Sequence, residues 1–303
     1  GVIGGCFCDE HKTQFLQKGG FGNTHWEELL DSVSARSLSS VLRAWVDFTC
    51  DRLTGSFRAM QSAAPEIVLG NMVMYLGAEK AGIRLADYEG APLRVGELMF
   101  DDTSFAPVKG KTDELFSALF HRRCVAPQLA YSETTAFPSD KLSAANMAAK
   151  LTISTIADVR QTMFMSGLTP FPRSHWETLA PAMKIQAGLH ACLAGHKPRG
   201  PFKHYWGERS RWVGDAEPFS LFLASGVPFE VTDEPARDGW TFLSDFDASA
   251  AGEGQLRSRG TKFVHRPSAK PPPPEAEPVA ESLDALFALK QRSAARLADV
   301  PHV

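Results

Sequence analysis

The stretch QLAYSETTAFP, residues 128–138, carries one glutamate near the end of a short segment whose composition favours a β-strand. Polar but β-compatible residues surround Glu133, and Pro138 ends the segment. A carboxylate at the C-terminal end of such a strand is where α/β barrels place their catalytic groups. A solvated glutamate, or one that caps the next helix, gives the same local pattern, so the order of the neighbouring elements decides between these interpretations.

Strand-like and helix-like segments alternate on both sides of Glu133. The segments expected to form strands are residues 2–5, 66–75, 93–100, 128–135 and 161–165. Between the first two, apolar residues at helical spacing predict one long helix from Asn23 or Thr24 to just before Pro65. Such alternation predicts parallel strands joined by right-handed crossovers.

Two α/β architectures fit this order of elements. Successive strand–helix units match strands four to eight of a (β/α)8 barrel, and the alternative is an open, doubly wound sheet. None of the expected strands is followed by a G-x-G-x-x-G turn, which argues against a nucleotide-binding doubly wound domain. We therefore expect an α/β protein in which residues 1–214 form the C-terminal part of a barrel.

The pattern changes near Gly214, where the expected strands become shorter. They lie at residues 227–232, 240–246 and 261–265, and a helix is expected at residues 281–298. The Pro-rich stretch KPPPPEAEP, residues 270–278, is typical of a semi-rigid linker before that helix. These segments predict a second, smaller α/β domain over residues 215–303.

The composition limits the class of protein and of partner. A chain of 303 residues with 44% hydrophobic residues is long enough for a large core. A net charge of −3 does not favour nucleic acid as a partner, and no apolar run approaches the roughly 20 residues that span a bilayer. The scattered cysteines do not suggest a disulfide framework, so we expect a cytoplasmic protein. GVIGG at residues 1–5 is typical of the end of a buried strand, and we expect a fragment that lacks an upstream part.

Three potential metal ligands follow the first expected strand. Cys6, Cys8 and His11 have the spacing C-x-C-x-x-H. Thiolate and imidazole ligands at this spacing can bind one zinc ion, which takes four ligands in a tetrahedron, so a fourth ligand would come from elsewhere. Two small residues at a strand end and an exposed histidine would give the same pattern without a metal.

A strand end followed by C-x-C-x-x-C or a near variant, with a helix behind it, resembles the family-42 β-galactosidases and related hypothetical glycoside hydrolases. Cys6 and Cys8 match the first two positions, and His11 stands where the third cysteine would be. The resemblance implies a (β/α)8 barrel whose fourth strand precedes the cluster, a structural zinc ion and no organic cofactor. It also implies a flavodoxin-like trimerisation domain after the barrel, and hence a homo-oligomer.

The same resemblance implies a catalytic glutamate at the end of the seventh strand, which is Glu133, and a general acid/base at or before Gly1. Retaining glycosidases use two carboxyl groups about 5–5.5 Å apart, one of which attacks the sugar and forms a covalent glycosyl-enzyme. Glu97, on the preceding expected strand, is a candidate for a second site carboxylate or for a hydrogen-bond acceptor of the substrate. A paired structural carboxylate inside the barrel is the alternative interpretation of Glu97.

Three further residues are candidates for contact with a sugar. Asn71, on the expected strand at residues 66–75, offers an amide, which a buried hydrogen bond would equally explain. His204 and Trp206 belong to an aromatic cluster with Tyr205, and aromatic faces stack on sugar rings. Such a cluster also packs one domain against another.

Three functions are compatible with these residues. The first is a glycoside hydrolase that acts on a carbohydrate with Glu133 as the nucleophile. The second is a non-catalytic module that binds carbohydrate or supports assembly on a degenerate barrel. The third is a metal-dependent hydrolase that uses the cluster at residues 6–11, although barrel hydrolases of that kind usually offer several histidines at strand ends. We expect the first function.

Overall fold

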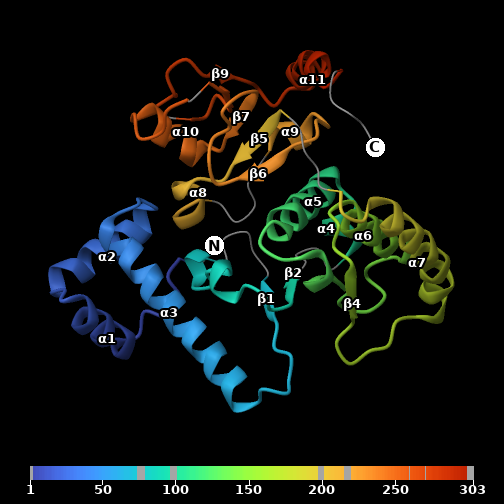
Figure 1. The fold of residues 1–303 in the computed structure, drawn as a ribbon, viewed down its shortest axis with the longest axis horizontal. Helices are drawn as coiled ribbons and strands as arrows, with labels where there is room; N and C mark the ends of the chain where they lie inside the picture. Colours follow the sequence, from blue (N-terminus) through green and yellow to red (C-terminus); the bar gives the residue numbers. More distant parts are fainter. Residues whose placement is uncertain are drawn as a thin grey trace. The chain divides into compact units, whose positions relative to one another are not determined.

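The chain forms two compact units in the computed structural model (Figure 1). The residues that the structure describes are 3–73, 79–95, 101–196, 201–214, 220–258, 260–269 and 271–298. We call Pro65–Leu76 with Tyr88–Pro198 the Glu133 unit, and Gly1–Ala64 with Gly77–Asp87 and Arg199–Val303 the terminal unit. The boundary predicted after Gly214 falls inside the terminal unit, because the sheet of that unit already begins at Phe202.

A four-stranded parallel sheet forms the centre of the Glu133 unit. Its strands are β1 (Asn71–Val73), β2 (Leu93–Val95), β3 (Ala130–Thr135) and β4 (Gln161–Met165). They lie in the order β1-β2-β3-β4, and each pairs in parallel with the next. The prediction of parallel strands in sequence order is therefore confirmed for these four strands. The strand predicted from residue 66 is wrong over residues 66–70, which are turn and loop with Ile67 and Val68 exposed. Residues 74–78 and 96–100, and Glu97 with them, lie outside the described residues.

The strand predicted at residues 2–5 is wrong where the structure describes it. Gly4 and Gly5 have φ angles of 83° and 70°, whereas a strand requires negative φ. A Cβ on Gly4 would lie 2.2 Å from Nε1 of Trp45, which donates a hydrogen bond of 2.7 Å to the carbonyl oxygen of Gly4. Glycine is needed here because the backbone passes close to a tryptophan, and not because a strand ends.

Helices cover one face of the four-stranded sheet. They are α4 (Asp102–Phe105), α5 (Val108–Arg122), α6 (Ala144–Ile156) and α7 (Arg173–Leu193), with the short 3-10 helix η3 (Pro127–Leu129) before β3. Ala130 of β3 packs in one core with Ala118 of α5. Phe164 of β4 packs in another with Met147 of α6 and Leu179 of α7. Right-handed crossovers between strands in sequence order place all the helices on one side.

The opposite face of this sheet is the open face. It carries Met72, Arg94, Tyr131, Glu133, Thr135, Gln161, Met163 and Met165, which share one side by their register. Parallel sheets are usually covered on both faces, yet Met163 is 43% exposed. Among the described residues the open face is thus partly exposed, at its methionines, while Glu133 and Thr135 on the same face are buried.

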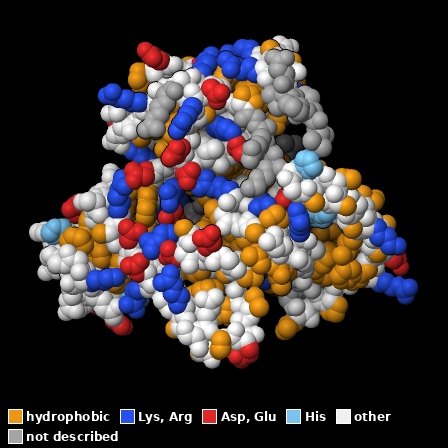
Figure 2. Space-filling view, viewed as in Figure 1, with side chains coloured by type: hydrophobic (Ala, Val, Ile, Leu, Met, Phe, Trp, Pro, Cys, Tyr) orange, Lys and Arg blue, Asp and Glu red, His pale blue; other side chains and the backbone are white. Residues whose placement is uncertain are grey.

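The outer surface of α7 is also apolar. Figure 2 shows hydrophobic side chains gathered on the side of the molecule where α7 lies. The exposed ones on this helix include Trp176, Met183, Ile185 and Leu189. Leu179 of the same helix is buried, so α7 presents apolar side chains both to the core and to the surface.

Three helices and two 3-10 turns form the first part of the terminal unit. They are α1 (Asp9–Gly19), α2 (Asn23–Ala35), α3 (Ser40–Ala63), η1 (Glu79–Ala81) and η2 (Leu85–Tyr88). The prediction of one long helix from residue 23 is wrong, because Arg36 takes a left-handed φ of 50° and ends α2. The side chain of Ser39 then accepts a hydrogen bond from the backbone N–H of Leu42 and starts α3 as an N-cap.

An aromatic core holds these helices together. The ring of Trp45 lies edge-on to the rings of Phe15 and Trp26, with centroids 5.0 Å and 5.3 Å away. Trp212 is buried in the same core although it lies far along the chain. Arg36 adds a hydrogen bond of 2.9 Å from its Nε to the carbonyl oxygen of Val213.

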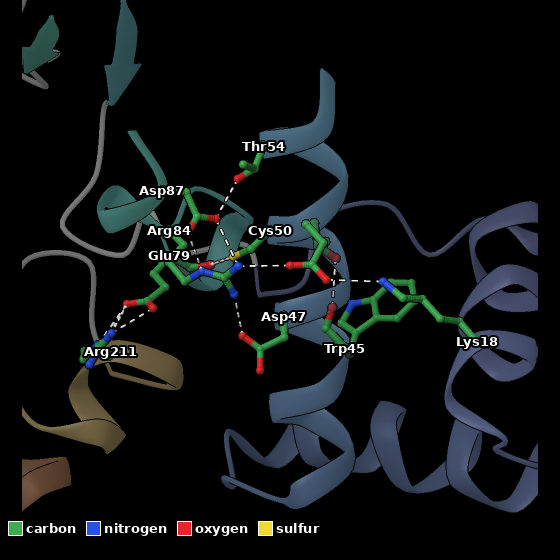
Figure 3. A network of polar contacts seen from close by, with 11 residues as sticks. Lys18, Trp45, Asp47, Cys50, Thr54, Glu79, Arg84, Asp87 and Arg211 are labelled. Atoms are coloured by element: carbon green, nitrogen blue, oxygen red, sulfur yellow. Dashed lines mark hydrogen bonds and ion pairs between the residues drawn. The ribbon is translucent and has the colours of Figure 1, made fainter. Parts of the chain in front are cut away.

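Ion pairs connect the segment that contains η1 and η2 to neighbouring elements of this unit (Figure 3). The guanidinium of Arg84 lies 2.9 Å from Asp47 of α3 and 3.0 Å from Asp87 of η2. Glu79 of η1 pairs at 2.8 Å with Arg211, which belongs to the last part of the chain. The segment therefore joins the N-terminal helices to the residues that follow the Glu133 unit.

A second parallel sheet forms the last part of the terminal unit. Its strands are β5 (Phe202–Tyr205), β6 (Glu230–Thr232), β7 (Trp240–Leu243), β8 (Lys262–His265) and β9 (Glu277–Pro278). The helices are α8 (Glu208–Trp212), α9 (Leu221–Ala224), α10 (Asp245–Gly252) and α11 (Leu283–Leu297). The strand order is β6-β5-β7-β8-β9, with every pair parallel. The strands predicted at residues 227–232, 240–246 and 261–265 and the final helix are confirmed with shorter bounds. β5 was not predicted, and β9 lies at the end of the stretch that was predicted to be a linker.

Helices cover both faces of this second sheet. On one face the ring of Phe202 in β5 lies 5.3 Å from that of Phe222 in α9, and Arg292 of α11 lies over Trp240. On the other face Leu243 of β7 packs in a core with alanines of α10. All the residues of β7 are accordingly buried.

Candidate functional site

Glu133 is the fourth residue of β3 and points to the open face. It is only 6% exposed, although its register partner Met163 on β4 is 43% exposed. A buried glutamate requires partners for its charge. The site is therefore defined by the side chains that contact this carboxylate.

Two side chains hold the Glu133 carboxylate. Nε of Arg94, on β2, lies 2.9 Å from Oε2 and forms an ion pair with it. Oγ1 of Thr135, two residues along β3, donates a hydrogen bond of 2.6 Å to Oε1. Hydrogen-bond donors and a cation favour the ionised form of a carboxylate. Such surroundings are compatible with a glutamate that acts as a nucleophile.

Methionine sulfurs surround the rest of the Arg94 side chain. Its Nη2 contacts Sδ of Met72 on β1, and its Nη1 lies 4.0 Å from Sδ of Met163 on β4. A thioether sulfur is a weak hydrogen-bond acceptor, so Glu133 is the strong partner of this guanidinium among the described residues. The result is one ion pair set among flexible apolar side chains on the open face.

The structure does not bring the other predicted sugar-binding residues to Glu133. Asn71 is half-buried in β1, and its register partner is Leu93, whereas Arg94 pairs with Met72. Asn71 therefore points to the helix-covered face of the sheet, away from the side that carries Glu133. Glu97 lies outside the described residues.

His204 and Trp206 are part of the core of the terminal unit. They are 0% and 1% exposed, and the His204 ring lies 4.9 Å from that of Phe242 in β7. Burial lowers the pKa of His204 to about 3. The prediction that they contact a sugar is not supported, since neither ring is accessible. They form a packed aromatic cluster, which was the alternative interpretation, but the cluster lies inside one unit.

Cys6, Cys8 and His11 come together at the start of α1. Their two Sγ atoms and a ring nitrogen all lie within 4.8 Å of one another, and Cys8 Sγ is 3.4 Å from His11 Nδ1. The ligand atoms of a tetrahedral zinc site lie roughly 3.3–3.8 Å apart, so a small movement would complete three corners. The backbone N–H of His11, and next the Cys6 thiol, lower the pKa of the exposed Cys8 thiol. This cluster could therefore hold a metal ion.

Sequence reasoning missed Arg94 and Thr135 as partners of Glu133. Thr135 could have been found, because residues two apart in a strand share a face. Arg94 interrupts an otherwise apolar strand segment, LRV, and a lone arginine in such a strand indicates a partner of opposite charge. The sequence therefore indicated that Arg94 has a partner of opposite charge, but it did not show the register that brings β2 and β3 together.

Comparison with models of protein families, with curated proteins and with solved structures found no match to this chain. Among the described residues, no helix combines the length and the apolar character that crossing a membrane requires.

Proposed function

We propose that this chain carries the nucleophile of a retaining glycoside hydrolase and that Glu133 has this role. The observation that best supports the proposal is the position of its carboxylate. Glu133 lies near the C-terminal end of β3 on the open face, where Arg94 contacts one of its oxygens and Thr135 contacts the other. The substrate is a carbohydrate, as the resemblance to family-42 β-galactosidases implies.

We also propose that the Glu133 unit is a segment of a (β/α)8 barrel. Parallel strands in sequence order, with helices on one face only, support this because the inner face of a barrel carries no helices. The strand order of the second sheet, numbered along the chain, is 2-1-3-4-5, the order of flavodoxin-like domains. A flavodoxin-like domain after a barrel, and a homo-oligomer built with it, agree with the same resemblance.

In the proposed reaction an oxygen of Glu133 attacks the anomeric carbon of the sugar. The bond from that carbon to the leaving group breaks, the leaving group takes the electron pair, and a covalent glycosyl-enzyme forms. A second carboxyl group protonates the leaving oxygen and later activates the water that releases the sugar. Glu97 remains a candidate for a second site carboxylate or for a hydrogen-bond acceptor of the substrate, and it lies outside the described residues.

We propose that Cys6, Cys8 and His11 hold a structural zinc ion. The chemistry of the donor set supports this, because two thiols and an imidazole are the ligands that zinc prefers. The ion would cross-link the loop at residues 6–8 to the first turn of α1. The attack on the sugar by Glu133 needs no part of this site.

A covalent label tests the proposed nucleophile. The probes are 2-deoxy-2-fluoroglycosyl fluorides of galacto, gluco and manno configuration, whose fluoride leaves without a proton. The Glu133 oxygen displaces that fluoride, and the fluorine at C2 slows hydrolysis of the product. Peptide mass spectrometry should find one fluorosugar on the peptide that contains Glu133, and Glu133→Gln should abolish the label.

A matched control is Glu177→Gln, since Glu177 is an exposed glutamate on α7 of the same unit. This variant should be labelled at the wild-type rate. A label on another residue, or labelling of Glu133→Gln at the wild-type rate, would remove Glu133 from the mechanism.

One observation favours the second candidate function, a non-catalytic carbohydrate-binding or assembly module. Both oxygens of Glu133 already have partners, and the side chain is 6% exposed, as in a structural ion pair. Such a module would bind a carbohydrate in calorimetry and would take no label from any of the three fluorides.

A further inference from the structure

We infer that Arg94 is the residue that positions the Glu133 carboxylate for attack, an inference that rests on the proposed function of Glu133. Arg94 would act through Glu133 and would not contact the sugar. The inference depends on where the two partners of the carboxylate lie along the strands, and on what fixes the guanidinium.

The carboxylate of Glu133 is held from two directions. Arg94 of β2 is in register with Tyr131, which lies two residues before Glu133 on β3. Thr135 lies two residues after it on the same strand. Arg94 therefore contacts Oε2 from the side of the N-terminal edge of the sheet, and Thr135 contacts Oε1 from the side of the C-terminal edge.

This geometry separates the two partners by function. The C-terminal edge is the side from which barrel enzymes admit substrates, so Thr135 is on the side that a sugar would approach. Arg94 is on the far side, where an ion pair with Oε2 does not obstruct that approach. Its ion pair with Oε2, together with the Thr135 hydrogen bond to Oε1, restricts the rotation of the carboxylate.

The neighbouring strands hold Arg94 in this orientation. Its two terminal nitrogens lie against the sulfurs of Met72 on β1 and Met163 on β4, and its Nε lies 2.9 Å from Oε2 of Glu133 as an ion pair without hydrogen-bond geometry. Methionine at position 94 would fit among these thioethers with similar length and without the charge. Arg94→Met is thus a variant that removes the cation and leaves the apolar surroundings intact.

The test is the rate of covalent labelling by the reactive fluoride as a function of pH. With Arg94→Met the carboxylate loses its cation, so the acidic limb of the profile should move to higher pH. Because the carboxylate also loses a contact that orients it, we expect labelling at pH 7 to fall at least tenfold. Arg94→Lys should recover part of both effects, because an ammonium group supplies the charge but not the planar guanidinium.

Arg173→Met is the control, because Arg173 forms an exposed ion pair with Glu177 on α7 of the same unit. Its profile should match that of the wild type. An Arg94→Met profile with the wild-type acidic limb, or an Arg94→Lys variant no better than Arg94→Met, would overturn the role of Arg94 while Glu133 remains the nucleophile.

A second measurement does not depend on the reaction. The melting temperatures of Arg94→Met, Glu133→Gln and the double variant form a double-mutant cycle. If Arg94 holds Glu133, the double variant should lose less than the sum of the two single losses. Additive losses would overturn the inference. A chain that takes no label refutes the proposed function, and the cycle still decides whether Arg94 holds the carboxylate.

Discussion

The two parallel sheets of this chain differ in the order of their strands and in what covers them. The sheet of the Glu133 unit runs β1-β2-β3-β4 and has helices on one face, with Met163 exposed on the other. The sheet of the terminal unit runs β6-β5-β7-β8-β9 and has helices on both faces, so that every residue of β7 is buried. Both sheets are parallel, but the first has one face without helices and the second has none.

The difference follows from the direction in which successive strands are added to each sheet. Successive right-handed crossovers that always move the same way place every helix on one side. When the direction reverses, as it does after β6, the next helix covers the opposite side. The open face carries the ion pair of Glu133 with Arg94, whereas full burial in the closed sheet favours the neutral form of His204.

The two sheets should differ most in the stability that each loses when one of its side chains is truncated to alanine. Phe242→Ala, in the middle of β7, should destabilise its sheet by about 3–5 kcal/mol because it removes a fully buried ring. Met163→Ala, on the open face, should destabilise its sheet by less than about 1 kcal/mol. Hydrogen exchange of the β7 and β4 amides reports the two units separately.

Equal losses from these two substitutions would break the comparison. They would mean that the open face is covered in solution. Repeating the Met163→Ala measurement at several protein concentrations would then show whether a second copy of the chain provides the cover.

The second effect is the response of the closed sheet to acid. The pKa of His204 in the folded chain is about 3, below the value of about 6.5 for an unfolded histidine. Its contribution to stability is therefore complete above about pH 6.5 and is lost as the pH falls, by about 2 kcal/mol between pH 7 and pH 5.

Unfolding of the terminal unit, followed at pH 7 and pH 5, checks this prediction. His204→Leu should remove that part of the pH dependence, and His25→Gln, which changes an exposed histidine of the same unit, should leave it unchanged. A His204→Leu variant as sensitive to acid as the wild type would contradict the prediction.

The smallest expected effect concerns the metal cluster. Zinc at ten times its dissociation constant should stabilise the terminal unit by about 1.4 kcal/mol. Cys6→Ser should abolish this gain, and Cys124→Ser, at an exposed cysteine of the Glu133 unit, should keep it. Melting with and without zinc, together with the zinc content per chain, measures both. Equal zinc content in the two variants would show that Cys6 is not a zinc ligand.

The strands of the Glu133 unit could be predicted because their apolar runs and turn residues are local features. Parallel pairing in sequence order follows from strand–helix alternation alone. The strand at residues 2–5 was wrong because GVIGG has the composition of a strand end, while the φ angles of Gly4 and Gly5 respond to Trp45, which is distant in sequence.

The contacts of the site depend on strand register and burial, which cannot be read from the sequence. Nothing local separates His204 in a core from His204 on a surface, because the aromatic neighbours are the same. The pairing of Arg94 with Glu133 requires knowledge of which residues of β2 and β3 lie side by side. The break between α2 and α3 at Arg36 was missed because no glycine or proline marks it.

The position of Trp212 in the core around Trp45 also sets the order of events as the chain is made. The helices at residues 9–63 leave the ribosome first, but Trp212 and Val213, which complete their core, follow only after the whole Glu133 unit. At about 5–20 residues per second, that delay is on the order of ten seconds or more. During that time the core around Trp45 lacks Trp212 and Val213, so the first helices cannot complete their packing until the residues of the Glu133 unit have been made.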